Sequence, residues 1–246
     1  MMRNFIRCSV LLSLVAVFGA CSSQEKTSDT PDGLYAIAED LEKSERYELA
    51  IQKYTEVKNK FPYSAFATKA ELAVADVHYK AESWPEAQVA YQTFRELHPT
   101  HPKIAYVIHR VGLSIYNQLP ETVDRDLTLS KDAIAAFDDV IKRFPQSEYY
   151  DDARVKKDEC LKKLAGKELY IGEFYFKREQ FDSALPRFEN VFKKYPGFSY
   201  DAEALSKAAI AAKKSSQADK ARRYLGILAQ KYPNSPELAA AQKEVP

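Results

Sequence analysis

The residues best suited to chemistry are few, and they do not form a reactive set. His98 and His101 stand three apart in the segment HPTHP. Zinc needs three or four side chains held in a fixed geometry, and no cysteine pair or carboxylate motif completes this histidine pair. The motifs G-x-S-x-G and H-E-x-x-H and the glycine-rich phosphate loop do not occur in the sequence. The sequence therefore predicts no enzyme, no metal site and no cofactor.

The composition indicates a helical protein that does not bind nucleic acid. The 246 residues include 36 Lys and Arg against 35 Asp and Glu, a net charge of +1, whereas nucleic-acid binding calls for a strong basic excess. Only 7 glycines occur, against 16 tyrosines and 13 phenylalanines, which favours packed helices over a turn-rich β fold. Three cysteines form no disulfide framework, and Cys160 is expected to be a small buried side chain.

The amino-terminal segment has the pattern of an export signal. Arg3 and Arg7 precede an apolar run at 8–18, which small residues and Cys21 follow. Small residues before a cysteine resemble the bacterial lipobox, which implies a signal peptide at 1–20 and diacylation of Cys21. A plain secretion signal with an incidental cysteine is the alternative.

The lipobox resemblance also implies where the protein resides. Acyl chains hold a protein firmly at a bilayer surface, and no other apolar run approaches the ~20 residues that a spanning helix needs. Ser22 follows the cysteine where an inner-membrane retention signal usually has Asp. By resemblance to enterobacterial sorting, this favours a lipid anchor in the outer membrane, with a flexible linker at 21–30 and the body in the periplasm.

One pattern of residues recurs five times along the rest of the chain. It consists of Ala, a large apolar residue four positions later, another apolar residue three further on, and Pro five beyond that. The copies are Ala50-Tyr54-Val57-Pro62, Ala87-Tyr91-Phe94-Pro99, Ala133-Phe137-Val140-Pro145, Ala184-Phe188-Val191-Pro196 and Ala221-Leu225-Leu228-Pro233. The first three positions share one face of a helix, and Pro disfavours helix at the residue before it. Each copy thus predicts a helix that ends just before its Pro.

The pattern is similar to the tetratricopeptide-repeat signature, in which two helices form each unit. Ser64, Ser147 and Ser235 follow the prolines and are suited to cap the next helix. Units of this kind bury their faces only against neighbours. The predicted fold is therefore an all-α tetratricopeptide-repeat solenoid of about five helix pairs.

Two irregular stretches predict a division into sub-arrays. Residues 118–130 interrupt the third unit as an extended loop, and 148–178 contain no Pro and are predicted to form one long helix, with Gly166 and Gly172 as its weak points. We therefore expect an N-terminal sub-array of repeats 1–3 at 31–147 and a C-terminal sub-array of repeats 4–5 at 148–246.

Three segments make the resemblance specific. HPTHP at 98–102, DRD at 124–126 and ELYIGEFYFKREQFDSALPRF at 168–188 resemble the BamD (YfiO-type) family of outer-membrane assembly lipoproteins, and the similarity spans about 31–235. The family is cofactor-free and belongs to the complex that inserts β-barrel proteins into the outer membrane. The resemblance implies docking of the C-terminal sub-array on a POTRA domain of the barrel protein BamA, beside other lipoproteins of the complex.

The resemblance also implies contact residues. The family arginine that contacts BamA matches Arg187, and Pro186 before it is expected in the first turn of its helix. The N-terminal sub-array would receive the terminal β-signal of unfolded outer-membrane clients, a strand that needs aromatic walls. The candidate client-binding residues are Tyr63, Phe66, Tyr79, His101 and Tyr106. A periplasmic adaptor of the Tol–Pal or cell-division kind is the alternative function.

Overall fold

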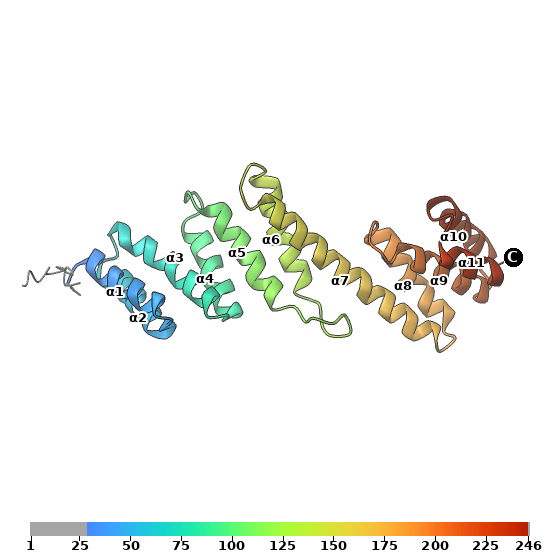
Figure 1. Ribbon diagram of the computed structural model, residues 1–246, viewed down its shortest axis with the longest axis horizontal. Helices are drawn as coiled ribbons and strands as arrows, with labels where there is room; N and C mark the ends of the chain where they lie inside the picture. Colours follow the sequence, from blue (N-terminus) through green and yellow to red (C-terminus); the bar gives the residue numbers. More distant parts are fainter. Residues whose placement is uncertain (1–28, 246) are drawn as a thin grey trace, which may run out of the picture.

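The chain is an all-α solenoid, and the predicted fold class is confirmed. The computed structural model describes residues 29–245, so the predicted signal peptide, Cys21 and most of the linker lie outside the described residues. Within this range the helices are α1 Pro31–Lys43, α2 Tyr47–Lys60, α3 Ala65–Lys80, α4 Trp84–Leu97, α5 Ile104–Asn117, α6 Ser130–Arg143, α7 Tyr150–Phe176, α8 Phe181–Lys194, α9 Asp201–Lys214, α10 Ala218–Lys231 and α11 Pro236–Glu244. Figure 1 shows them stacked in chain order along one long axis, with α11 closing the array.

Five helix pairs follow from the recurring pattern. The alanine of every copy is fully buried, and so are the rings of Tyr91, Phe137 and Phe188. In the fifth copy the pattern has Leu225 at this position, but Leu225 is only partly buried against the core. The preceding residue, Tyr224, is buried instead. The tetratricopeptide pairing is therefore kept in all five units, with a shift of one residue in the last.

The prolines end helices as predicted, but the serines cap fewer than predicted. The residue before each Pro is the C-cap of α2, α4, α6, α8 and α10. Ser235 caps α11 by accepting a bond from the Leu238 N–H at 3.1 Å. The prediction is wrong for Ser64, whose side chain makes no capping bond, and for Ser147, which lies outside the cap because α7 begins at Tyr150. The spacing of the serines in the sequence was not sufficient to predict at which residue each helix begins.

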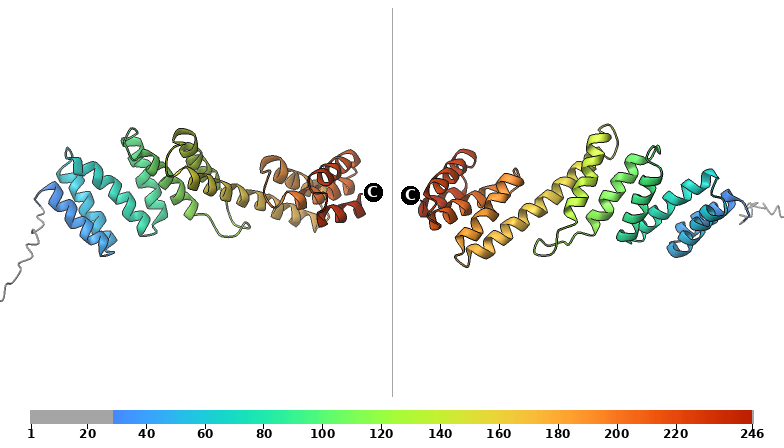
Figure 2. Two further views of the ribbon diagram at one scale, coloured as in Figure 1. Left: turned by 45° about the horizontal axis from the view of Figure 1, so that its top comes forward. Right: turned by 180° about the vertical axis from the view of Figure 1, so that it is seen from behind.

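The long helix predicted at 148–178 is α7, which has 27 residues. Figure 2 shows α7 running without a break, with α6 beside its first half and α8 beside its second. Its glycines are contact points rather than weak points. A Cβ on Gly172 would lie 2.6 Å from Phe188 Cε1, and one on Gly166 would lie 3.3 Å from Val123 Cγ1. Both glycines let another part of the chain approach the helix backbone.

The buried residues form three clusters, and two of them meet within α7. One cluster spans α1–α3, the next takes in α3–α6 and includes Cys160, and the last begins at Ala165 and includes α8–α11. The division into sub-arrays at 31–147 and 148–246 stays a prediction. Cys160 is fully buried, and burial raises the pKa of its thiol to about 11, so the thiol stays protonated at neutral pH.

The loop between α5 and α6, at 118–129, is tied to α7 by two lysines one helical turn apart. The Lys163 ammonium donates to the carbonyls of Pro120 and Glu121, both at 2.9 Å. The Lys167 ammonium donates to the carbonyls of Asp124 and Arg125 at 2.8 and 3.0 Å. The loop therefore rests on α7 near the point where the two clusters meet.

Four of the turns inside repeats contain one residue in the left-handed region, namely Glu45, Glu82, Glu179 and Ser216, with φ of 56–59°. An L-residue there costs roughly 1–2 kcal/mol, which Gly avoids, although Gly loses more chain entropy on folding. We expect Ser216→Gly to raise the free energy of unfolding by about 0.5–1 kcal/mol, measured by urea unfolding. Ser215→Gly is the matched control, because Ser215 has an ordinary φ of −89° and Gly should destabilise there. Equal effects at both positions would contradict the expectation.

Candidate functional site

The arginine proposed to contact a partner lies on α8 and is held by α7. Arg187 Nη1 lies 3.3 Å from Glu168 Oε2, and Asn190 donates to the same oxygen at 3.0 Å. The Arg187 side chain is 40% exposed, and that of Glu168 is 18% exposed. A guanidinium has five donors, so a surface arginine anchored through one nitrogen keeps donors for a carboxylate on another protein.

Pro186 does not lie where the sequence predicted. It is the sixth residue of α8, counted from Phe181, and not part of the first turn. Because proline has no N–H, it cannot donate to the carbonyl of Asp182, and the helix continues to Lys194 regardless. The first-turn expectation failed because α8 already begins at Phe181, five residues before the proline. Pro186 weakens the helix immediately before Arg187.

Two of the five candidate client-binding residues lie together. The rings of Tyr79 on α3 and Tyr106 on α5 face the Arg110 guanidinium, with its carbon 4.4 and 5.1 Å from their centroids. Asp76 Oδ1 accepts hydrogen bonds from the hydroxyls of Tyr106 and Tyr91, each at 2.6 Å. Burial, with the Asp76 carboxylate adding to it, raises the pKa of Tyr106 to about 12. This cluster links α3, α4 and α5 through polar groups.

The other three candidates lie elsewhere. Tyr63, in the turn between α2 and α3, is fully exposed, whereas Phe66 packs against Tyr35 with ring centroids 5.4 Å apart. His101 packs edge-on against Phe94 at 5.1 Å. Phe66 and Tyr79 are separated along α3 by about 20 Å, at 1.5 Å per residue. The structure thus assembles one aromatic cluster around Arg110 and does not bring the five residues into a single groove.

Sequence reasoning missed Arg110, Asp76 and Tyr91. Arg110 forms no ion pair with the carboxylates of residues 29–245, and its Nε is buried without a hydrogen-bond partner there. Tyr91 had been noted only as a position of the repeat pattern, and Arg110 and Asp76 belong to no motif. Their contacts join helices about 30 positions apart in the sequence. A charged residue on the apolar pattern of α5 was the one available signal.

His109 links the third repeat to the start of α7. It is 6% exposed, its Nε2 lies 2.7 Å from Asp152 Oδ2, and its ring stacks on Tyr149 at 5.1 Å. Burial lowers the pKa of His109, and Asp152 only partly opposes this. Burial also lowers the pKa values of His78 and His101.

The lowered pKa of His109 predicts acid sensitivity. The unfolded chain binds the proton first, so the contribution of the neutral imidazole to stability is fully present above the unfolded pKa, about 6.5. It is lost as the pH falls through that value toward the folded pKa. We expect His109→Gln, which cannot titrate, to flatten the dependence of the unfolding midpoint on pH between about 7.5 and 5. The same slope in both proteins would rule out His109 as a main source of acid sensitivity.

Comparison of the sequence with known proteins identifies its family. The family described as "Outer membrane lipoprotein" (YfiO) matches residues 27–224. The chain belongs to the YfiO family of outer membrane lipoproteins. Similar members of the family include "Outer membrane protein assembly factor BamD" of Neisseria gonorrhoeae, 29% identical over 94% of this chain and 92% of its own. The protein of the same name from Rickettsia prowazekii is 31% identical over 92% of this chain and 91% of its own.

Structural similarity of lower degree extends beyond the family. A TPR repeats protein of Bacteroides fragilis is similar over 89% of this chain and 98% of its own, with 15% identity and a TM-score of 0.48. No helix within residues 29–245 is both long and apolar enough to cross a membrane.

Proposed function

We propose that this protein is a lipid-anchored scaffold and receptor subunit of the machinery that assembles outer-membrane β-barrels. The observation that carries the proposal is the family match over residues 27–224, together with relatives named outer membrane protein assembly factors. Cys21, acylated, would hold the chain on the periplasmic face of the outer membrane. The described helices fit a scaffold, since an extended solenoid offers long surfaces to partners.

Docking on the POTRA region of a BamA-like barrel is assigned to Arg187. Its anchoring by Glu168 supports this role, because a guanidinium held in place loses less side-chain entropy on binding. The complex that contains this BamA-like barrel would also include other lipoproteins. Unfolded clients would be received by repeats 1–3, where Tyr79 and Tyr106 offer aromatic surface beside a guanidinium, and Tyr63, Phe66 and His101 remain candidates.

Affinity capture of the tagged, acylated protein from detergent-solubilised envelopes tests the proposal. We expect recovery of a POTRA-bearing barrel protein, and a reduction by about tenfold in Arg187→Glu. Arg187→Gln should give an intermediate loss, because it removes the charge without placing a carboxylate beside Glu168.

Lys194→Glu is the matched control, because Lys194 is an exposed cation on the same helix. Far-ultraviolet circular dichroism of each variant excludes unfolding as the cause. Recovery of Tol–Pal or division proteins without such a barrel would overturn the proposed function. Undiminished capture by Arg187→Glu would overturn only the contact assignment.

A further inference from the structure

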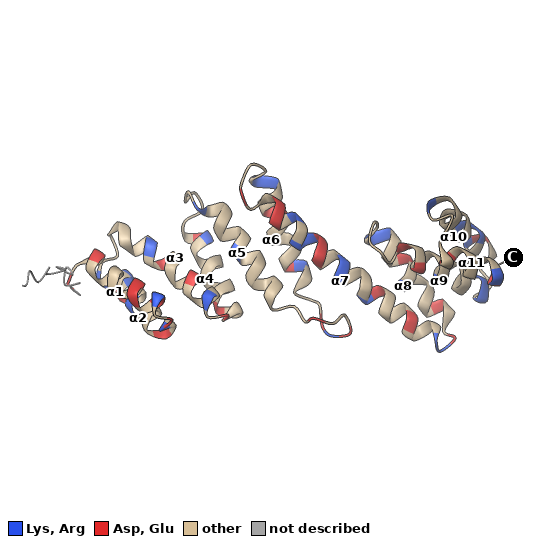
Figure 3. Ribbon diagram, viewed as in Figure 1, with Lys and Arg blue, Asp and Glu red and all other residues tan. Residues whose placement is uncertain are grey.

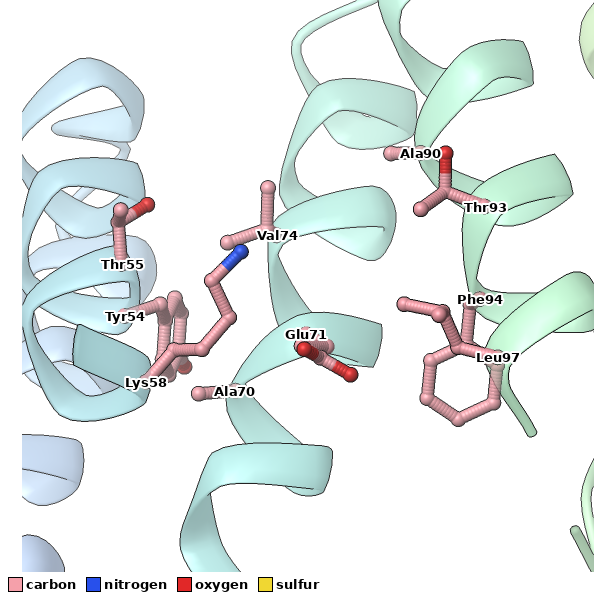
Figure 4. Close-up of a pocket in the computed structure, with 10 residues that line it drawn as sticks. All are labelled: Tyr54, Thr55, Lys58, Ala70, Glu71, Val74, Ala90, Thr93, Phe94 and Leu97. Atoms are coloured by element: carbon pink, nitrogen blue, oxygen red, sulfur yellow. The ribbon is translucent and has the colours of Figure 1, made fainter. Parts of the chain in front are cut away.

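The solenoid repeats one type of groove on its even-numbered helices. In each case two successive even-numbered helices form the walls, and the odd-numbered helix between them forms the floor. Figure 4 shows the groove between α2 and α4, with Ala70, Glu71 and Val74 of α3 on its floor. The groove between α4 and α6 has a volume of about 580 Å³, and that between α8 and α10 about 260 Å³.

The three grooves share a position in the repeat but differ in charge. The α2–α4 groove is lined by one cation and one acid, Lys58 and Glu71. The α4–α6 groove has two cations against three acids, which are Asp132, Asp138 and Asp139. The α8–α10 groove has three cations against one acid: Lys193, Arg223 and Lys231 against Asp201. We call this last one the basic groove.

The charge of the basic groove is available for a ligand. Arg223 and Lys231 are exposed and form no ion pair with any carboxylate of residues 29–245. Lys193 binds Glu189 at 2.6 Å, and the same carboxylate also accepts the Tyr224 hydroxyl at 2.5 Å. The Glu189 carboxylate is therefore already bound by Lys193 of α8 and by Tyr224 of α10, and it forms no ion pair with Arg223 or Lys231.

Apolar side chains line part of the floor and both walls of the basic groove. Leu205 of α9 is buried, and Phe192 and Ile227 are half-buried on the two walls. Cations at the rim above an apolar floor suit a chain in which acidic and apolar side chains alternate, because successive residues of an extended strand point to opposite sides. A bilayer surface would reach the rim cations but not the floor.

A buried acceptor also points to a peptide backbone. Asp201 is 6% exposed and lines the basic groove. Its Oδ2 accepts the Gly197 N–H at 2.8 Å, whereas its Oδ1 is buried without a hydrogen-bond partner among the described residues. A buried acceptor without a partner is costly, and a backbone N–H inserted into the groove would satisfy it.

The charge of the wider surface favours the same class of partner. Residues 181–245 contain eleven Lys and Arg against seven Asp and Glu, an excess of four positive charges. Residues 31–147 contain fourteen against eighteen, an excess of four negative charges. In Figure 3 blue segments lie on and near α10 and α11, and others lie along α6 and α7. Such a field attracts acidic partners to the carboxy-terminal end of the array.

We propose that the basic groove between α8 and α10 binds an extended acidic segment of a partner protein, with acidic side chains on Arg223 and Lys231 and apolar ones on Ile227 and Phe192. This surface is distinct from the one assigned to Arg187, which contacts α7 on the other side of α8. The inference does not rest on the proposed function, since it follows from the groove alone.

Fluorescence anisotropy with the full chain in detergent tests the inference. The probes are a labelled peptide of alternating Glu and Val and the same peptide with Lys in place of Glu. We expect the acidic peptide to bind and the basic one not to. The double variant Arg223→Glu, Lys231→Glu should weaken binding by about tenfold or more, because it reverses the charge at the rim.

Arg222→Glu is the matched control. Arg222 is the neighbour of Arg223, but its guanidinium pairs with Asp219 at 2.6 Å and does not line the groove. We expect its affinity to stay within about twofold of the wild type. Ile227→Asp adds a variant that changes the wall and not the rim, and it should also weaken binding.

Several results would overturn the inference. These are equal binding of acidic and basic peptides, equal losses in Arg222→Glu and in the double variant, and no binding of the acidic peptide at all. Charge-dependent binding to vesicles containing phosphatidylglycerol, without peptide binding, would assign the cations to a lipid surface instead. The Arg187 capture experiment is independent of all these outcomes, so failure here leaves the proposed function standing.

Discussion

Replacing Gly172 by Ala is expected to destabilise the protein, although alanine is the better helix former. Gly172 is buried in α7, and an added Cβ would lie 2.6 Å from Phe188 Cε1. Phe188 is fully buried, so its ring cannot move aside without disturbing the core of α8 and α9. Overpacking of this kind costs about 1–3 kcal/mol, more than the roughly 1 kcal/mol that helix propensity returns. Thermal and urea unfolding of the variant measure the net effect.

The same substitution elsewhere should have the opposite sign. Gly226 lies exposed in α10, and nothing would contact an added Cβ there within 4 Å. Gly226→Ala should therefore stabilise by about 0.5–1 kcal/mol. A double-mutant cycle with Phe188→Leu separates packing from propensity, because Gly172→Ala should cost less once the ring is removed. A Gly172→Ala variant as stable as Gly226→Ala would mean that α8 adjusts freely.

Replacing Lys163 and Lys167 by Met is expected to release the loop at 118–129 from α7. The two ammonium groups make four hydrogen bonds to loop carbonyls. Bonds to charged groups contribute about 1.5–3 kcal/mol each when shielded from water, and less when exposed as here. Trypsin cleavage after Arg125, which is exposed in this loop, should accelerate by at least about tenfold, measured by mass spectrometry of the fragments.

Lys162→Met is the control for the loss of a lysine from α7. Lys162 is exposed on the same helix, and no bond joins it to the loop. Its cleavage rate after Arg125 should match that of the wild type. If the double variant were cleaved no faster than this control, Val123 and the buried Leu127 would be sufficient to hold the loop.

The features that the sequence predicted well are those fixed by neighbouring residues. Proline acts on the residue before it, so the ends of five helices followed directly from five prolines. The absence of proline between 148 and 178 predicted α7 to within two residues at each end. The alanines of the pattern were predicted to face the neighbouring helix, and all five are fully buried.

The features that it predicted poorly depend on contacts between distant residues. Nothing near Lys163 indicates that it binds carbonyls 43 positions away. Tyr63 and Phe66 are three residues apart and both aromatic, yet one is fully exposed and the other packs against Tyr35. The difference in charge among the three grooves also arises only when successive even-numbered helices are placed side by side.

Because α7 is continuous, the number of residues in it sets the orientation of α8–α11 relative to the helices before it. An α-helix turns about 100° and rises about 1.5 Å for each residue. A single insertion between Cys160 and Ala165 would therefore turn α8–α11 about the helix axis by more than a quarter of a revolution, while lengthening the chain very little. An insertion of seven residues would restore the angle to within about 20° and move the two ends about 10 Å further apart. The angle and the separation of the two ends of the array can thus be varied almost independently, by the choice of how many residues one helix contains.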